Sequence, residues 1–156
     1  MNVLYVDRGV NERAEREYGA RKVELDELLS ASDFVLLQPP LTAETRNLIS
    51  TPQLKAMKRS AFLINASRGE IVDEAALVEA LKEGTIAGAG LDVYLEEPLP
   101  AESPLLKMNK VVTLPHIGSA TQETRRAMNK NAAENLVGAL NGTLLSNMVN
   151  PEVFER

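Results

Sequence analysis

Short apolar runs alternate along this chain with longer segments of helical periodicity. The runs cover residues 3–6, 34–37, 61–64, 86–91 and 111–114. Within each run the apolar residues follow one another without alternating polar positions, which is typical of strands covered on both faces of a parallel sheet. Because helical segments separate these strands, the pattern predicts an α/β fold with a doubly wound, Rossmann-like parallel sheet.

The segments between the runs contain recognisable helix ends. Thr51 stands before a proline and Asp73 before a run of alanine and leucine, two patterns that begin helices. Ser119, with a glutamine three residues later, has the spacing of a capping box ahead of a long helix. Gly84 and Gly142 are the expected stops of the second and third of these helices.

Composition excludes several classes of protein. The chain has 156 residues, a formal net charge of −5, a single histidine and no cysteine. Disulfides, zinc-thiolate sites, iron–sulfur clusters and a cysteine nucleophile are therefore excluded, and we expect no metal site. The acidic balance and the scattered Lys and Arg argue against a nucleic-acid partner. Without an apolar run of about 20 residues or a signal core, we expect no membrane association and a cytoplasmic location.

Polar residues stand where the predicted strands end. Asp7, Gln38, Asn65, Asp92 and His116 follow the successive runs, the last after a proline. Ligands of open parallel sheets bind beyond the carboxyl ends of the strands, so these residues are candidates for a site. Any one of them alone is explained as well by a turn or a helix cap.

The residues after the first predicted strand indicate a dinucleotide-binding site. Asp7 stands where such a sheet places the acid that accepts hydrogen bonds from the adenosine ribose, and its charge favours NAD over NADP. The neighbouring Arg8 could instead hold the extra phosphate of NADP, and Asp7 could simply cap the next helix. The glycines of segment 84–90 run into a strand, so we expect them to permit close packing rather than to bind a pyrophosphate.

Two further strand ends suggest recognition of an acid and transfer of a proton. Arg68, in a Ser-Arg-Gly turn, has the planar fork that matches a carboxylate with an adjacent carbonyl, although a solvated surface arginine is equally consistent. His116 suits proton transfer, although a lone histidine is usually structural. Glu96 and Glu97 lie in the loop before its strand, and either could fix the imidazole tautomer or belong to a solvated acidic loop.

Three motifs resemble the cofactor domain of D-isomer-specific 2-hydroxyacid dehydrogenases. They are NASRGEIVDEAAL at 65–77, AGAGLDVYLEEP at 87–98 and LPHIGSAT at 114–121, in the family's order. Within the family the chain is most similar to glyoxylate/hydroxypyruvate reductases and 2-ketogluconate reductases. The resemblance implies NAD(P)-dependent reduction of a small 2-keto acid to the D-2-hydroxy acid, in a family whose members are typically homodimers.

The resemblance also implies the role of each site residue. Arg68 would bind the substrate carboxylate and keto oxygen, His116 would be the acid/base, and Glu97 rather than Glu96 would pair with it. Asp92 is similar to the residue that contacts the nicotinamide amide, and the pair of Asp7 and Arg8 occupies the ribose-reading position. The remaining positions that would line the cofactor are Ala66, Ser67, Ile117, Gly118, Ser119 and the loop from Pro40 to Glu44.

The resemblance begins at the second strand of the family's cofactor domain. We therefore expect residues 1–143 to form a partial dinucleotide-binding domain that lacks its first β-α unit. The missing strand would lie between runs 3–6 and 61–64, which either close up against each other or leave a gap in the sheet. Residues 144–156 would be a tail that packs on a substrate domain. On this interpretation the chain is a truncated piece, inactive alone; an NAD-binding, corepressor-like interaction module and a fragment without function are the alternatives.

Overall fold

The computed structural model describes residues 1–143 and 147–154. The chain divides into two compact units, Met1–His116 and Ile117–Arg156, which are described separately.

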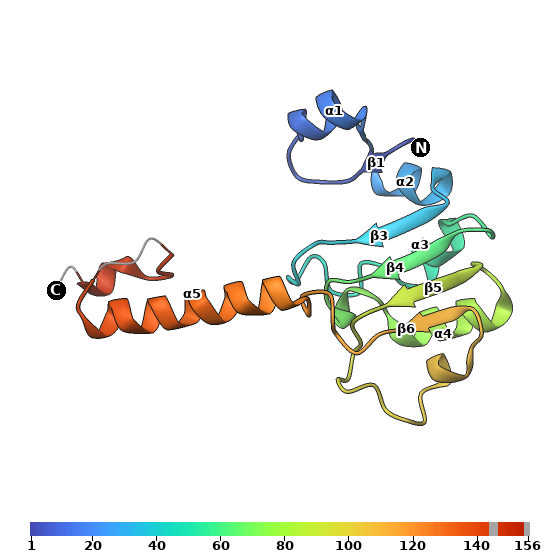
Figure 1. The fold of residues 1–156 in the computed structure, drawn as a ribbon. Coiled ribbons are helices and arrows are strands. Elements are labelled where there is room, and N and C mark those ends of the chain that lie inside the picture. The colour runs from blue at the N-terminus through green and yellow to red at the C-terminus, as the bar shows by residue number, and fades with distance from the viewer. Residues whose placement is uncertain (144–146, 155–156) are drawn as a thin grey trace. The chain divides into compact units, whose positions relative to one another are not determined.

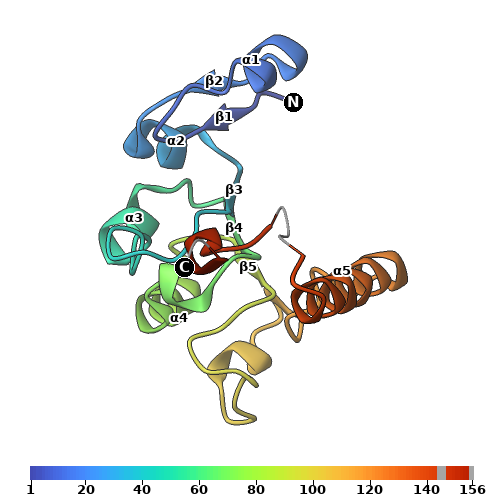
Figure 2. The ribbon, with the colours of Figure 1, turned by 90° about the vertical axis from the view of Figure 1, so that its left-hand side faces the viewer.

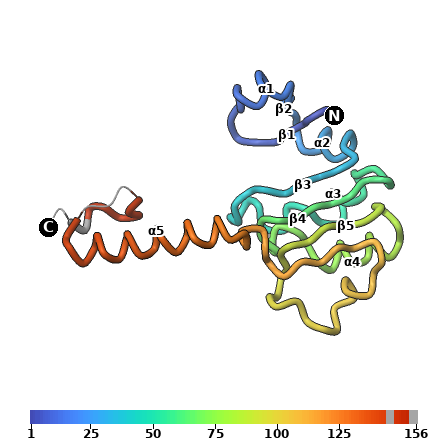
Figure 3. Tube along the Cα trace, viewed as in Figure 1, coloured from blue at the N-terminus to red at the C-terminus, as the bar shows by residue number. Residues whose placement is uncertain are grey.

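The first unit contains a parallel sheet of four strands. Its order is β3-β4-β5-β6, and the arrowheads of all four point the same way in Figure 1. The strands are β3 (Phe34–Leu37), β4 (Phe62–Asn65), β5 (Gly88–Leu91) and β6 (Val111–Thr113). The connection from β5 to β6 runs from one end of the strands back to the other, as parallel pairing requires (Figure 3). The predicted α/β class with a parallel, Rossmann-like sheet is confirmed.

Helices cover one face of this sheet. They are α2 (Leu25–Ala31), α3 (Thr51–Ala56) and α4 (Glu74–Glu83), and α3 and α4 lie together on one side of the strands in Figure 2. Leu54, Leu77 and Leu81 of these helices share a buried core with Val35 and Leu63 of the sheet. This core fixes the strands to a rigid layer, which holds their ends in place.

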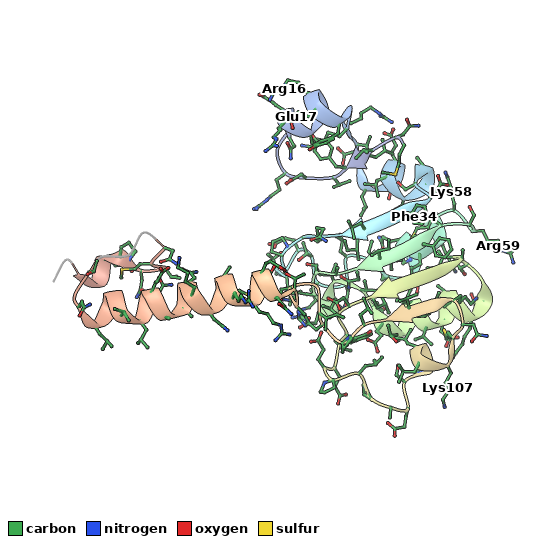
Figure 4. All side chains as sticks on the ribbon, viewed as in Figure 1. Arg16, Glu17, Phe34, Lys58, Arg59 and Lys107 are labelled. Atoms are coloured by element: carbon green, nitrogen blue, oxygen red, sulfur yellow. The ribbon has the colours of Figure 1, made fainter. Side chains whose placement is uncertain are left out.

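The opposite face of the sheet differs from the sequence prediction. Burial alternates along β3, where Val35 and Leu37 are buried, while Phe34, labelled in Figure 4, is 62% exposed and Leu36 is 57% exposed. The expectation of cover on both faces is therefore wrong for this unit. The apolar run does make both faces of the strand apolar, but the helices of this unit pack on one of them.

A separate two-stranded parallel sheet corrects the predicted position of the gap. It pairs β1 (Leu4–Tyr5) with β2 (Arg21–Lys22), and α1 (Glu12–Tyr18) connects them. Strand β2 was not predicted because it is short and basic. Since Phe34 of β3 pairs directly with Phe62 of β4, the break falls between β1 and β3 and not beside the run at 61–64.

Two predicted helix starts are displaced by one or two residues. The N-cap of α3 is Ser50, whose backbone N–H donates to Gln53 Oε1 at 3.2 Å, so Thr51 is already helical. The long helix α5 (Gln122–Leu140) of the second unit has Thr121 as its N-cap, not Ser119, because the Thr121 hydroxyl accepts the N–H of Thr124 at 3.2 Å. The expected start of α4 is confirmed, with Asp73 accepting the N–H of Ala76 at 3.1 Å.

The stops of α4 and α5 are also as predicted. Gly84 at the end of α4 has a φ of 69°, and Gly142 follows the C-cap Asn141 of α5 with the same φ. Beyond this point the 3₁₀ helix η3 (Pro151–Phe154) is described, while residues 144–146 and 155–156 of the expected tail lie outside the described residues. None of the helices in the described part of the chain is long and apolar enough to cross a membrane.

The glycines of β5 permit close packing, as expected. A Cβ added to Gly88 would overlap the carbonyl oxygen of Lys110 and lie 2.9 Å from the ring of Phe62, whereas one added to Gly90 would meet only Ile64, at 3.9 Å. The missing side chain of Gly88 thus allows β4, β5 and the start of β6 to approach one another.

We predict that Gly88→Ala lowers the free energy of unfolding by about 1–3 kcal/mol, the usual cost of overpacking a core. Urea denaturation followed by circular dichroism measures this change. Gly90→Ala in the same strand is the matched control and should change stability by less than about 1 kcal/mol. Equal destabilisation by both substitutions would contradict the packing argument.

Candidate active site

The carboxyl ends of β4, β5 and β6 lie along one edge of the sheet (Figure 1). Backbone hydrogen bonds continue past the strands, from Asp92 N–H to the Asn65 carbonyl at 2.9 Å and from Leu114 N–H to the Leu91 carbonyl at 2.8 Å. Lys58 and Arg59, labelled in Figure 4, lie at the opposite edge, before β4 begins. The segments that carry Arg68, Asp92 and His116 therefore leave the sheet at the same edge.

The turn after β4 positions Arg68. Asn65 is 1% exposed, and its side chain donates to the Arg68 carbonyl at 2.9 Å and accepts the Ser67 N–H at 3.1 Å. The Ser67 hydroxyl donates to the Pro39 carbonyl at 2.6 Å, which joins this turn to the loop after β3. The Arg68 guanidinium is exposed and donates to the Ser67 carbonyl at 2.6 Å. A fixed backbone thus carries a cationic side chain at the surface.

His116 and Glu97 form a direct pair. His116 Nδ1 lies 2.7 Å from Glu97 Oε2, and Glu97 Oε1 accepts the N–H of Tyr94 at 3.1 Å. The hydrogen bond from His116 holds the pKa of Glu97 below its usual range, against the opposing effect of burial. A carboxylate on Nδ1 fixes the tautomer, so Nε2 is the nitrogen available for exchange of a proton with a ligand. Glu97, and not its neighbour Glu96, makes this contact.

A cavity of about 500 Å³ opens beside this pair. Apolar side chains form most of its wall around the polar Glu97 and His116, and they are those of Pro98, Leu99, Leu106, Leu114 and Pro115. Leu106 belongs to the 3₁₀ helix η2 (Pro104–Lys107), in the connection between β5 and β6. An apolar wall next to a polar pair is typical of sites that bind small molecules.

Asp7, the acid predicted to bind the adenosine ribose, lies at the end of the first strand. Asp7 and Arg8 are exposed just beyond β1, and Asp7 Oδ1 accepts the N–H of Arg8 at 2.6 Å. Asp7 does not cap the next helix, because the N-cap of α1 is Asn11, whose side chain accepts the Ala14 N–H at 2.9 Å. Lys22 Nζ donates to the Arg8 carbonyl at 3.2 Å, which brings a second cation to this loop.

The other predicted cofactor positions occupy different parts of the chain. Pro40 and Ala66 are exposed in the loops after β3 and β4, and Asp92 is buried at the end of β5. Gly118 and Ser119 belong to the second unit, where they are exposed and precede α5. Within residues 1–143 and 147–154, the structure brings together no group of three or more His, Asp or Glu side chains that could hold a metal ion.

The contacts of two residues near the site were not predicted from the sequence. Asn65 was a candidate for the site because it follows a strand, and a polar amide that ends a buried strand signals hydrogen bonds to the following turn. Tyr94 was not among the predicted site residues. Its hydroxyl lies 2.9 Å from the carbonyl oxygens of both Leu91 and Leu114, contacts for which the sequence carries no signal.

Comparison with known proteins identifies the class. Residues 1–118 match the family described as D-isomer specific 2-hydroxyacid dehydrogenase, NAD binding domain, and the chain belongs to this family. The resemblance noted in the motifs is thereby confirmed.

Individual relatives make the comparison more specific. Over 156 residues the chain is 54% identical to glyoxylate/hydroxypyruvate reductase B of Serratia proteamaculans, covering 100% of this chain and 48% of the relative. A crystal structure of a Thermus thermophilus protein has a TM-score of 0.85 at 45% identity and covers 92% of this chain and 44% of its own. An NAD-complexed D-isomer specific 2-hydroxyacid dehydrogenase of Lactobacillus delbrueckii has a TM-score of 0.82 at 34% identity, with coverages of 96% and 48%. The chain thus spans about half the length of the curated relatives it matches.

We predict that Glu97 makes the stability of the chain depend on pH on the acid side. Its pKa is lowered in the folded state, so its contribution is present above the unfolded pKa of about 4.3 and is lost as the pH falls through the folded pKa. Glu97→Gln should cost less than about 1 kcal/mol at neutral pH, because the pair is partly exposed, and nothing at strongly acidic pH.

Urea denaturation from about pH 3 to pH 7 measures this difference. Glu96→Gln is the matched control, because it removes the adjacent acid without removing the contact to His116. A constant difference between the wild type and Glu97→Gln over this range would contradict the prediction.

Proposed function

We propose that this chain carries the cofactor-binding and acid/base groups of an NAD(P)H-dependent reductase that converts a small 2-keto acid to the D-2-hydroxy acid. The observation that carries the proposal is the contact of 2.7 Å between His116 Nδ1 and Glu97 Oε2, at the sheet edge where the Arg68 turn also lies. The relative's name, glyoxylate/hydroxypyruvate reductase B, directs the substrate toward these two keto acids.

The residues divide the reaction among them. The bound NAD(P)H supplies the hydride that reduces the keto carbon. Arg68 holds the substrate carboxylate through its planar fork, which orients the keto group. His116 donates a proton from Nε2 to the keto oxygen, where negative charge develops, and Glu97 holds the imidazole orientation through Nδ1. In the oxidative direction the same nitrogen accepts the proton from the hydroxyl group.

The donor set at the carboxyl edge fits the two ends of a dinucleotide. Asp7, beyond β1, offers an exposed carboxylate oxygen of the kind that accepts from a ribose hydroxyl. Asp92 would contact the nicotinamide amide, and Ser67, Ala66 and Pro40, which follow β4 and β3, would line the cofactor. Gly118 and Ser119 of the second unit stay predicted cofactor positions. The Asp7 carboxylate favours NAD, and Arg8 beside it provides a cation suited to the phosphate of NADP. A homodimeric assembly and a cytoplasmic location stay predictions.

The interaction-module alternative has less support. An NAD-binding corepressor could keep the arginine, the acid and the histidine, so these residues do not separate the two functions. The names of the relatives favour the enzyme, because those that match over the whole chain are called glyoxylate/hydroxypyruvate reductase B.

We predict that His116→Gln reduces kcat by about 100-fold or more, with a much smaller change in KM, because it removes the proton donor but keeps the size of the side chain. Because the chain spans about half of its relatives, the assay joins it to the part of the Serratia proteamaculans reductase that it does not match. Oxidation of NADPH and NADH by this chimera is followed with glyoxylate and hydroxypyruvate. A chimera that turns over normally after His116→Gln contradicts the proton-transfer role.

We predict that Arg68→Lys acts mainly on substrate binding. Lysine keeps the positive charge but loses the bidentate fork, so KM for the keto acid should rise about tenfold or more. Arg46→Lys is the matched control, because this exposed arginine contacts Glu70, at 4.0 Å, rather than the pair of Glu97 and His116. The same chimera measures both variants, and an unchanged KM in Arg68→Lys would speak against recognition of the carboxylate.

A further inference from the structure

Tyr94 lies between the three segments that carry Arg68, Glu97 and His116. It follows β5 by three residues and is 6% exposed. Its hydroxyl, its backbone N–H and its carbonyl each contact a different part of the site. Neither the sequence motifs nor the proposed mechanism gives this side chain a task.

The hydroxyl joins two strand ends. It lies 2.9 Å from the Leu91 carbonyl oxygen at the end of β5 and 2.9 Å from the Leu114 carbonyl oxygen just beyond β6. The single hydroxyl proton is shared between these two acceptors. Because Leu114 precedes His116 by two residues, this bond fixes the backbone from which the imidazole extends. Burial raises the pKa of the Tyr94 hydroxyl, so it remains a donor across the physiological range.

The backbone N–H of Tyr94 holds the acid of the pair. It donates to Glu97 Oε1 at 3.1 Å, while Oε2 of the same carboxylate contacts His116. The next residue, Leu95, donates its N–H to Glu74 Oε2 at 3.2 Å, which attaches the segment to the first turn of α4. The position of the Glu97 carboxylate therefore depends on where Tyr94 places its backbone.

The carbonyl of Tyr94 packs against the Arg68 turn. Gly69 approaches it so closely that an added Cβ would overlap the Tyr94 carbonyl group. The residue that follows Arg68 must therefore be glycine if both segments keep their places. Tyr94 thus contacts the arginine turn directly, in addition to the acid and the strand end before the histidine.

We propose that Tyr94 is the positioning residue of this site, whose hydroxyl holds His116 in the orientation that binds Glu97. Its effect on catalysis rests on the proposed function, but its effect on the pair does not. The hydroxyl supplies a bond that phenylalanine cannot make, while the aromatic ring fills the same space in the core.

The test uses the intact chain and the imidazole of its only histidine. In nitrogen-15-labelled protein the Nδ1–H proton of His116 gives one resonance. The rate at which this proton exchanges with solvent reports on its hydrogen bond to Glu97. We expect Tyr94→Phe to accelerate this exchange roughly tenfold or to abolish the resonance, because loss of one hydrogen bond frees the strand end. The methyl resonances of core Leu63 and Leu77 should remain dispersed, which shows that the fold is intact.

The other two tyrosines supply matched controls. Tyr18 is 68% exposed, and Tyr18→Phe should leave the His116 resonance unchanged. Tyr5 has a bonded hydroxyl away from the site, which donates to Glu15 at 2.9 Å and accepts the Asn11 N–H at 2.8 Å. Tyr5→Phe should therefore lower stability without altering the His116 resonance, which separates loss of a tyrosine hydrogen bond from loss of positioning.

An unchanged Nδ1–H exchange rate in folded Tyr94→Phe would overturn the proposal. If Tyr94→Phe does not fold, the wild-type chain decides, because the hydroxyl proton of a tyrosine that is 6% exposed and bonded to two carbonyls should exchange slowly. A Tyr94 hydroxyl that exchanges as fast as that of exposed Tyr18 overturns the proposal as well. These measurements do not require turnover. The positioning role of Tyr94 can therefore be confirmed even if the reductase assay shows no activity.

Discussion

Backbone hydrogen bonds between β4, β5 and β6 hold the carboxyl ends of these strands in one row, and the segments that leave this row build the site. The bonds from Asp92 to Asn65 and from Leu114 to Leu91 extend the row beyond the strands. Short segments after these strands then place Arg68, Glu97 and His116 beyond the carboxyl ends of the sheet. A parallel sheet supplies this arrangement because all of its strands end on the same side.

The sequence predicts the parts of the fold that depend on local pattern. The apolar runs at 34–37 and 111–114 become strands, and Asp73 caps α4, because hydrophobic continuity and capping act within a few residues. Strand β2 is different, since Arg21 and Lys22 have no apolar pattern and are strand residues only through pairing with β1. The predicted gap was misplaced because the pairing of β3 with β4 depends on contacts between distant segments, which no local pattern specifies.

The candidate site divides in the same way. The motifs predict Arg68, Glu97 and His116 as site residues after strand ends. In the structure Glu97 and His116 contact each other directly. The supports are tertiary contacts: Tyr94 reaches Leu114 across 20 positions of sequence, and Ser67 reaches Pro39 across 28. No periodicity or spacing encodes such contacts, so reasoning from the residues alone finds the reactive groups and misses the groups that hold them.

The backbone conformation at His116 supports the proposed role of this pair in proton transfer. His116 has a φ of 54°, a left-handed conformation that is costly for a residue with a side chain, although less so for histidine than for most. The contact to Glu97 offsets little of that cost, because partly exposed ion pairs contribute at most about 1 kcal/mol. The hydroxyl of Tyr94 bonds to the Leu114 carbonyl two residues before His116, and the imidazole lies beside an open cavity that a ligand could enter.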